Sequence, residues 1–468
     1  MLWLELRRRG AGTLSRQLYR QLVDKILAGE LPGGARLPSS RALAAAQRIA
    51  RNIVVAVYEQ LLAEGYLEIR TGSGTFVAHL PTPRPTERTT SAPPGIPPAP
   101  ASSDFTDTIS FICGTPDLGR FPRARWLSCL RQVGFFRETK MWAYAPPAGS
   151  PALRAEIAAY LRRAKGIDCT AAQVLVTAGA APALAFVAQL LCGRRSGALV
   201  EDPVVSFVPA LLRAAGHAIT PVPADAAGLA VDRLPRRPRA RLVFVSPSHQ
   251  FPLGATLTIQ RRLALVDYAR RHDLLIVEDD YDSEFRHEGS PVDSLCRLAP
   301  ERVLHLGTFS KCLAPALRLG FVVLPAALVA RAEQAAAALH LGGSRYVQEA
   351  MARFLQQDHL ARHVGCMQRL YRRRRDRLRT ALATHFGGSV AISGCSTGLH
   401  LVATFSGVRF DTSTRARLAA RGIDVDTVDD YSVGRPRHSG ALVLGYGHLS
   451  FSEIDEGVHR LSTALATH

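Results

Sequence analysis

The sequence lacks the patterns that mark metal-binding, disulfide-bonded and membrane-spanning proteins. Its eight Cys form no CxxC pair and have irregular spacing, which argues against a zinc site and against a disulfide framework. Its 15 His show no metal-ligand spacing. No apolar run approaches the roughly 20 residues that span a bilayer, and the first ten residues, MLWLELRRRG, lack the apolar core of a signal peptide. We therefore expect a cytoplasmic protein with no metal and no membrane partner.

Acidic residues are scarce relative to basic ones. The chain has 39 Asp and Glu against 58 Lys and Arg, a net charge of +19. This excess favours polyanionic partners such as nucleic acid or phosphates, although an Arg-rich host proteome would produce the same excess. The densest basic run, RLYRRRRDRLR at residues 369–379, is predicted to be the solvated face of a helix rather than a DNA-binding strip.

The composition changes abruptly at one place in the chain. Residues 81–103, PTPRPTERTTSAPPGIPPAPASS, are too rich in Pro, Ser and Thr to form a packed core. We expect a linker over residues 81–108, and we call residues 1–80 the head and residues 109–468 the body. A chain of 468 residues has room for at least these two domains.

The head shows the pattern of three helices and a hairpin. Apolar residues recur at helical spacing over residues 14–26. Ser39 or Ser40 can cap a short second helix, RALAAAQR, and a third helix is predicted over RNIVVAVYEQLLAEG. YLEIRTGSGTFVA then alternates around Gly72 and Gly74, which indicates a β-hairpin. Three helices followed by a hairpin form a winged helix-turn-helix.

These head motifs resemble the DNA-binding domain of the GntR family of bacterial repressors over residues 12–79. In a helix-turn-helix, the N-terminus of the second helix of the pair enters the major groove. Arg51 and Asn52 stand there, where Arg can read guanine and Asn adenine. The remaining candidate contacts to phosphate, base edges or the minor groove are Arg41, Arg70, Gly72 and Gly74.

In the body, conspicuous motifs fall where predicted strands end. Apolar runs such as VLVTAG, RLVFVSPS, LLIVEDDY and RVLHLGTFSK alternate with helical stretches, a pattern typical of a largely parallel sheet flanked by helices. Ligands of such sheets bind at the carboxyl ends of the strands. The motif LLIVEDDYDSEF puts carboxylates at that edge, where burial requires a cation such as a pyridinium nitrogen.

Two further motifs supply an amine and a cradle for an anion. HLGTFSKCLAPALRLG has Lys311 after a strand and Arg318 seven residues later. A lysine near a phosphate and an acid suggests a Schiff base with an aldehyde cofactor. VLVTAGAAPAL runs from a strand through Gly179 into a helix, so that free backbone N–H groups can hold a phosphate. Each motif alone is weak, but their order and spacing together indicate one site.

Together the motifs resemble fold-type I pyridoxal-phosphate enzymes of the aminotransferase class. More closely, SPSHQFPLGATL, VEDDYDSEFR and GTFSKCLAPALRLGF, joined to a GntR-type head by a Pro-rich linker, resemble the MocR/GabR subfamily of transcriptional regulators. The resemblance spans nearly the whole chain. It implies a multidomain α/β protein, in which an N-terminal winged helix-turn-helix precedes a fold-type I transferase-like domain with a mostly parallel central sheet.

The resemblance also implies roles for residues of the body. Lys311 would form the Schiff base with pyridoxal phosphate, Asp279 would hold the pyridine N–H, and Tyr281 would hydrogen-bond the phenolic oxygen. His249 would lie beside the cofactor ring. The residues implied to hold the phosphate are Thr308, Arg318, Gly179, Ala180 and Ala181.

Among the departures from the family pattern, two concern the cofactor ring and the effector. After VEDP the family commonly has an aromatic residue that stacks on the ring, whereas this chain has Val204, Val205 and Ser206. Either the stacking is lost or Phe207 supplies it. His448 stands where carboxylate-binding relatives carry Arg, which predicts a weaker hold on an amino-acid effector, because His lacks the bidentate fork.

Two functions of different classes fit these motifs. The first is a bacterial regulator that binds double-stranded promoter DNA as a homodimer, in the cytoplasm and at the nucleoid. It would sense pyridoxal phosphate, or an amine that reacts at Lys311, and control genes such as those of vitamin B6 or amino-compound metabolism. The second is an active aminotransferase with an appended DNA-binding domain. The head favours the first, since an enzyme gains nothing from reading DNA, and a residual transaminase half-reaction stays open.

Overall fold

The structure is a computed structural model that describes residues 4, 6, 13–70, 72–79, 108–134, 143–193, 197–289 and 293–466. Its contacts divide the chain into two compact units, residues 1–102, which contain the head, and residues 103–468, which contain the body. The predicted linker at residues 81–108 lies outside the described residues except for its last position. No helix in the described ranges is long and apolar enough to cross a membrane.

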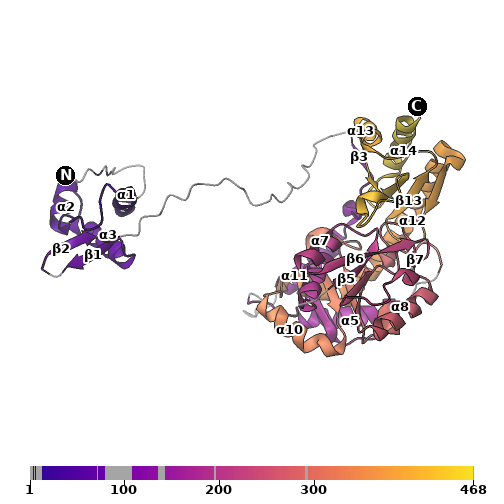
Figure 1. Cartoon of the computed structure of the whole chain (residues 1–468), viewed down its shortest axis with the longest axis horizontal. Coiled ribbons are helices and arrows are strands. Elements are labelled where there is room, and N and C mark those ends of the chain that lie inside the picture. The colour runs from indigo at the N-terminus through magenta and orange to yellow at the C-terminus, as the bar shows by residue number, and fades with distance from the viewer. Residues whose placement is uncertain are drawn as a thin grey trace. The chain divides into compact units, whose positions relative to one another are not determined.

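The head consists of three helices and a two-stranded hairpin, as its periodicity predicts (Figure 1). Its elements are α1 (Leu14–Leu27), α2 (Ser40–Gln47), α3 (Arg51–Ala63), β1 (Leu67–Arg70) and β2 (Gly74–Val77). Of the two capping candidates, Ser39 is the one that caps α2: its hydroxyl accepts a hydrogen bond from the backbone N–H of Ala42 at 3.2 Å. Ala50 precedes α3 and offers no side-chain cap.

The body is built on an eight-stranded sheet with the order β4-β11-β10-β9-β8-β5-β6-β7. Neighbouring strands from β10 to β6 run parallel, while β4, β11 and β7 pair antiparallel with their neighbours. The strands are β4 (Val174–Thr177), β5 (Gly197–Asp202), β6 (Ala218–Asp225), β7 (Gly228–Leu229), β8 (Leu242–Val245), β9 (Leu275–Asp280), β10 (Val303–Thr308) and β11 (Gly320–Val323). The predicted mostly parallel central sheet is therefore confirmed.

Helices cover both faces of this sheet, as two separate hydrophobic clusters show: alternate residues of a strand belong to different clusters. On β8, for example, Val243 and Val245 pack in one cluster and Leu242 and Phe244 in the other. One face packs against α6 (Ala180–Leu190), α7 (Phe207–Ala214) and α10 (Val329–Ala338). The other face packs against α5 (Pro151–Lys165), α8 (Ile259–Arg271), α11 (Arg345–Gln356) and α12 (His359–Phe386).

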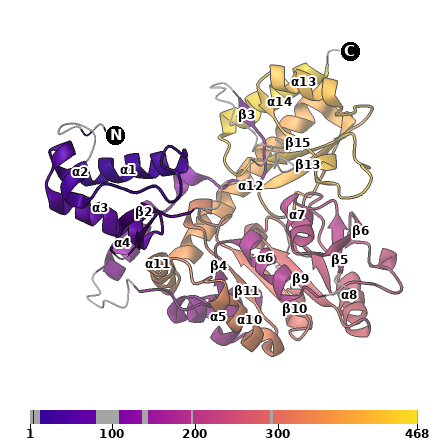
Figure 2. The same ribbon diagram turned by 60° about the vertical axis from the view of Figure 1, so that its left-hand side comes forward.

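A smaller part of the body follows α12 and lies beside the large sheet, as Figure 2 shows. Its four-stranded sheet has the order β12-β13-β16-β15. Its strands and helices are β12 (Val390–Ser393), β13 (His400–Phe405), α13 (Thr412–Ala420), β14 (Ile423–Asp424), β15 (Asp426–Thr427), β16 (Ala441–Gly445) and α14 (Phe451–Leu465). The remaining described strand and α-helices of the body are β3 (Ile109–Ser110), which pairs with β14, α4 (Arg123–Gly134), and α9 (Leu295–Leu298), which lies between β9 and β10 in the chain.

The basic run at residues 369–379 lies on α12 but is not wholly a solvated face. Arg374 and Arg375 are buried. Arg374 donates to Asp117 at 2.7 Å, and Arg375 donates to Glu288 at 2.7 Å. The prediction of a solvated face is therefore wrong for these two residues, whose burial is compensated by ion pairs to distant segments.

Candidate functional site

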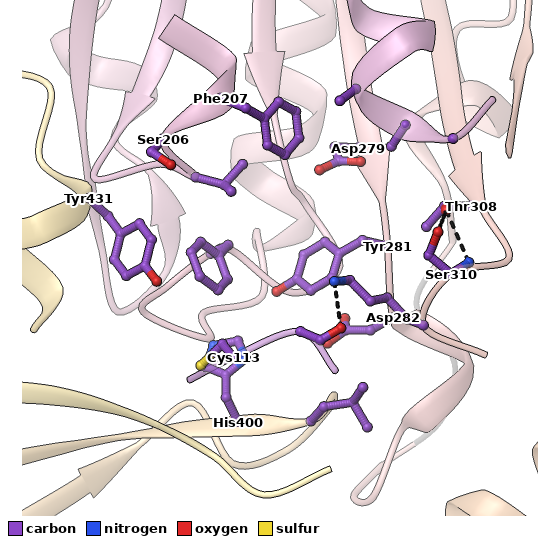
Figure 3. Close-up of a pocket in the computed structure, with 18 of the residues that line it drawn as sticks. Cys113, Ser206, Phe207, Asp279, Tyr281, Asp282, Thr308, Ser310, His400 and Tyr431 are labelled. Carbon is purple, nitrogen blue, oxygen red and sulfur yellow. Dashed lines mark hydrogen bonds between the residues drawn. The ribbon is translucent and has the colours of Figure 1, made fainter. Parts of the chain in front are cut away.

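A cavity of about 310 Å³ lies where strands β9 and β10 end and helix α6 begins. Figure 3 shows Thr308 and Ser310 at one end of it, Tyr431 at the other, and Tyr281 between them. Most of the residues that the sequence predicts for the cofactor line this cavity: Gly179, Ala180, Ala181, Phe207, Asp279, Tyr281, Thr308, Lys311 and Arg318. The carboxyl edge of the parallel strands thus gathers motifs that are far apart in the chain.

Lys311 lies three residues beyond the end of β10. Its amino group donates a hydrogen bond to the carbonyl oxygen of Gly114 at 2.7 Å. Burial lowers the pKa of Lys311, and the nearby Asp282, Cys113 and Asp279 partly oppose this shift. A lysine with a lowered pKa is a better nucleophile towards an aldehyde.

Gly114 is suited to this contact by its missing side chain. Its φ is +98°, in the region that favours glycine. A Cβ atom at this position would lie 2.5 Å from the Lys311 amine. The positive φ therefore favours glycine here, and the missing Cβ leaves room for the amine beside the backbone.

Asp279, near the end of β9, carries a buried oxygen without a partner. Its Oδ1 has no hydrogen-bond partner among the described residues, and the residue is only 7% exposed. Burial raises its pKa to about 7, with further contributions from Asp280 and Asp282. A carboxyl of this kind needs a cationic N–H group, which is what a protonated pyridine nitrogen offers.

The end of the cavity that holds Thr308 and Ser310 is suited to a phosphate. Gly179 has φ +112° and precedes α6, whose first turn has no side-chain cap. The backbone N–H groups at the start of α6 therefore remain available to an anion. The Thr308 hydroxyl is engaged with Ser310, whose backbone N–H donates to it at 3.2 Å. Arg318, with φ +49°, completes this end of the cavity.

Tyr281 is backed by a buried polar cluster. Its hydroxyl lies 3.0 Å from Nδ1 of His249, and that nitrogen is also 3.0 Å from both carboxylate oxygens of Asp282. His249 does not line the cavity itself, but its ring stacks on Tyr281 with centroids 5.7 Å apart. Ligand atoms of His249, Asp282 and His400 lie within 4.8 Å of one another, a group that could hold a metal ion.

Of the two positions that depart from the family pattern, one lines the cavity and the other does not. Phe207 lines the cavity together with Val205, so an aromatic ring is present although it lies two residues later than in the family pattern. His448 does not line the cavity. Its Nε2 lies 2.9 Å from the carbonyl oxygen of Ser110, so the structure holds it against β3 instead.

Sequence motifs missed several residues of the cavity. Ser310 and Asp282 stand inside motifs that were recognised, where proximity to Lys311 and Asp279 was the available signal. Cys113, His400 and Tyr431 also line the cavity, but they come from segments without a motif. The hydroxyl of Tyr431 donates to Asp426 at 2.5 Å.

The head presents its candidate DNA-binding residues on its surface. Arg51 and Asn52 are the first two residues of α3, and both are exposed. Arg41, also exposed, lies in the first turn of α2. Since Ala50 provides no cap, the N–H groups of the first turn of α3 are free of side-chain acceptors from that position. Helix N-termini of this kind contact DNA phosphates.

In the hairpin, the candidate residue Arg70 is already paired within the head, and a second arginine lies near the tip. Gly72 (φ +77°) and Gly74 (φ +114°) form the exposed tip. Arg70 is held by Glu68 at 2.6 Å and lies 4.6 Å from the ring centre of Phe76. Arg36, which the motifs did not single out, is exposed beside Gly74.

Comparison with known proteins assigns both parts. Residues 14–77 match the family "Bacterial regulatory proteins, gntR family", and residues 126–416 match "Aminotransferase class I and II", a domain that typically binds pyridoxal phosphate. The chain is therefore a helix-turn-helix transcription regulator with an aminotransferase-like domain.

Full-length relatives make the assignment more specific. The chain is 34% identical to the "Probable rhizopine catabolism regulatory protein MocR" of Rhizobium meliloti, over 96% of this chain and 93% of the relative. It is 32% identical to the "HTH-type pyridoxine biosynthesis transcriptional regulator PdxR" of Corynebacterium glutamicum, over 92% and 91%. The chain belongs to the MocR-type family of helix-turn-helix transcriptional regulators.

The solved structures support the fold of the body. The kynurenine aminotransferase of Pyrococcus horikoshii matches with a TM-score of 0.71 and 24% identity, covering 77% of this chain and 91% of that one. At this identity the likeness shows a shared fold-type I architecture and no shared activity.

Proposed function

We propose that this regulator binds pyridoxal phosphate in the cavity of the body and that the state of the cofactor controls how the head binds promoter DNA. The observation that carries the proposal is the buried Oδ1 of Asp279, which has no partner in the described part of the chain and lies in the same cavity as the Lys311 amine. Each group alone is costly to bury, and one pyridine aldehyde would engage both.

Each end of the cavity has a role in this proposal. Lys311 holds the cofactor covalently, Asp279 keeps the pyridine nitrogen protonated, and Tyr281 donates to the phenolic oxygen. The phosphate takes the N–H groups at the start of α6, with the side chains of Thr308 and Arg318. The cofactor supplies an electrophilic carbon to an incoming amine.

The effector is pyridoxal phosphate itself or a small amine that reacts with it. We place the target among genes of vitamin B6 or amino-compound metabolism, in line with the pyridoxine biosynthesis named for one relative. The body dimerises, and the linker at residues 81–108 lets each head reach one DNA half-site. A ligand controls DNA binding in this way only if it binds two arrangements of the dimer unequally.

Replacement of Lys311 tests the proposal. Lys311→Ala is expected to lose the visible absorption band of the bound cofactor and to abolish cofactor-dependent changes in DNA affinity. Lys311→Arg is the matched variant, because it keeps the cation and loses the reactive amine. Both variants are expected to retain the DNA affinity of the cofactor-free protein. Persistence of the band and of the cofactor response in both variants would contradict the proposal.

The complete set of Lys311, Asp279 and Tyr281 also supports a second function, a working aminotransferase with an appended DNA-binding domain. Sustained turnover of an amine and keto acid pair would favour it. We expect at most one half-reaction, which leaves the cofactor in its amine form and can be followed by absorbance.

A further inference from the structure

Behind Tyr281, three polar atoms compete for one site on a histidine ring. Nδ1 of His249 is 3.0 Å from both oxygens of Asp282 and 3.0 Å from the Tyr281 hydroxyl. His249 is 2% exposed and Asp282 is 1% exposed, so water does not compete for these contacts. The other ring nitrogen of His249 lies 3.4 Å from the carbonyl oxygen of Gly394.

One proton decides the direction of these hydrogen bonds. A ring nitrogen and a carboxyl group 3.0 Å apart attract each other only with a proton between them, whichever of the two atoms holds it. That proton occupies the single in-plane position of Nδ1. The Tyr281 hydroxyl therefore cannot donate its hydrogen to Nδ1, and its oxygen faces the shared proton as an acceptor. The hydroxyl hydrogen is left free to point into the cavity that Tyr281 lines.

We propose that His249 and Asp282 are a positioning pair that directs the hydroxyl hydrogen of Tyr281 towards the phenolic oxygen of the bound pyridine cofactor. This inference rests on the proposed function, since it assumes the same cofactor in the same cavity. Neither residue of the pair has to touch the reacting atoms. The pair acts through Tyr281, whose pKa burial and the neighbouring carboxylates raise, so that it remains a proton donor.

The packing holds the pair in this arrangement. A Cβ atom on Gly398 would lie 2.2 Å from Oδ2 of Asp282 and 2.4 Å from the His249 ring, so the opposite side of the pair has no spare room. His400 packs at 4.7 Å between ring centroids, and its Nε2 is bound to the Pro252 carbonyl oxygen at 3.0 Å. Burial lowers the pKa of His400, which keeps this neighbour uncharged.

Other titratable groups face the pair or Tyr281 from every element around them. Carboxyl groups come from β5 and from β9 and its following turn, an imidazole from the segment just after that turn, a thiol from the segment after β3, an amine from the turn after β10, and a phenol from the residue after β16: Glu201, Asp279, Asp280, Glu284, His287, Cys113, Lys311 and Tyr446. These groups set the baseline of any pH titration, and they are common to all the variants compared below.

The experiment measures the pH at which the visible absorption band of the bound cofactor changes. A donated hydrogen bond stabilises the proton-poor form, in which the phenolic oxygen has unshared negative charge, and so lowers this pH. Tyr281→Phe is expected to raise the midpoint by roughly one to two pH units. His249→Phe keeps an aromatic ring but frees Tyr281 to donate to Asp282. This variant is expected to raise the midpoint by about one pH unit.

Two comparisons separate positioning from a merely structural role. In the Tyr281→Phe background, His249→Phe is expected to cause no further shift, because the effect passes through the missing hydroxyl. His249→Asn, whose amide N–H can replace Nδ1–H, is expected to restore the midpoint. His217→Phe is the control, since His217 is equally buried, bound to a backbone carbonyl, and lines no part of the cavity.

Three outcomes would overturn the inference: no shift in His249→Phe, shifts that add in the double variant, or a midpoint in the wild-type protein that moves on chelation of metals. The last would mean that His249, Asp282 and His400 hold an ion instead of a shared proton. If His249→Phe does not fold, His249→Gln replaces it, because the longer side chain moves its N–H away from Asp282. Failure of the wild-type protein to bind the cofactor would instead refute the proposed function.

Discussion

The candidate functional residues of the head are exposed to solvent, whereas those of the body lie within a cavity. In the head, Arg41, Arg51 and Asn52 lie on the surface, where charged and polar side chains cost little free energy. In the body, Asp279 and Lys311 are held in a cavity where burial shifts both pKa values. The candidate DNA-binding residues of the free protein therefore show no costly burial that would reveal them. The cofactor site is recognisable because it buries ionisable groups that a ligand would pair.

The largest expected effect is on the stability of the cofactor-free protein, which should depend on pH because of Asp279. Burial raises the pKa of Asp279 from 3.8 to about 7. The folded state therefore holds its proton to higher pH than the unfolded state, and stability is lost as pH rises from about 4 to 7. Asp279→Asn removes this loss, so the cofactor-free variant should exceed the wild type by roughly 4 kcal/mol at pH 8. Denaturant unfolding at pH 4.5 and pH 8 measures the difference.

The control for this prediction is Asp267→Asn, which changes an exposed carboxylate on α8. It should leave the difference between the two pH values unchanged. A stabilisation by Asp279→Asn that is equal at pH 4.5 and pH 8 would show that the Asp279 carboxyl is not the source.

The same substitution should weaken cofactor binding while it stabilises the empty protein. Asp279→Asn leaves the buried pyridine nitrogen without a negative partner, a loss that corresponds to an affinity decrease on the order of 10²–10³-fold. Equilibrium titration with pyridoxal phosphate, followed by absorbance, measures it. Unchanged affinity would place the pyridine nitrogen elsewhere and would remove the contrast between the two parts of the molecule.

The sequence predicted the two folds and most of the cavity because their signals are local. Lys311, Asp279 and Arg318 stand in motifs at strand ends, and strand ends of a parallel sheet meet at one edge. The same logic failed for Gly114, whose carbonyl oxygen binds Lys311 from 197 residues away. A backbone carbonyl is common to all residue types, so no residue pattern could indicate that contact.

Charge patterns were the least reliable signal. The run at residues 369–379 includes Arg374 and Arg375, which are buried against acids 257 and 87 residues away. Helical spacing shows which residues share a face but not which distant carboxylate will meet them. The His249–Asp282 contact was missed for the same reason, since nothing in the sequence pairs the two segments.

In the head, a substitution should change affinity without changing stability. Arg51→Ala removes a side chain placed to read a base, and is expected to lower specific DNA affinity by about tenfold or more, with unfolding free energy changed by less than about 0.5 kcal/mol. Arg20→Ala on α1 is the matched control, because it removes the same charge from another exposed helix. Both variants are measured on promoter fragments at one salt concentration. Equal losses of affinity would show that Arg51 contributes only its charge.

The smallest expected effect concerns the hairpin, where the contrast between the two parts is weakest. Arg70 is already bound to Glu68 at 2.6 Å, so its charge is partly neutralised before any DNA arrives. Glu68→Ala should release it and raise non-specific DNA affinity a few-fold, with a salt dependence steeper by about one counterion. In an Arg70→Ala background the same change should have less effect, because only the loss of the acid remains. Equal effects in both backgrounds would mean that Arg70 does not reach the DNA.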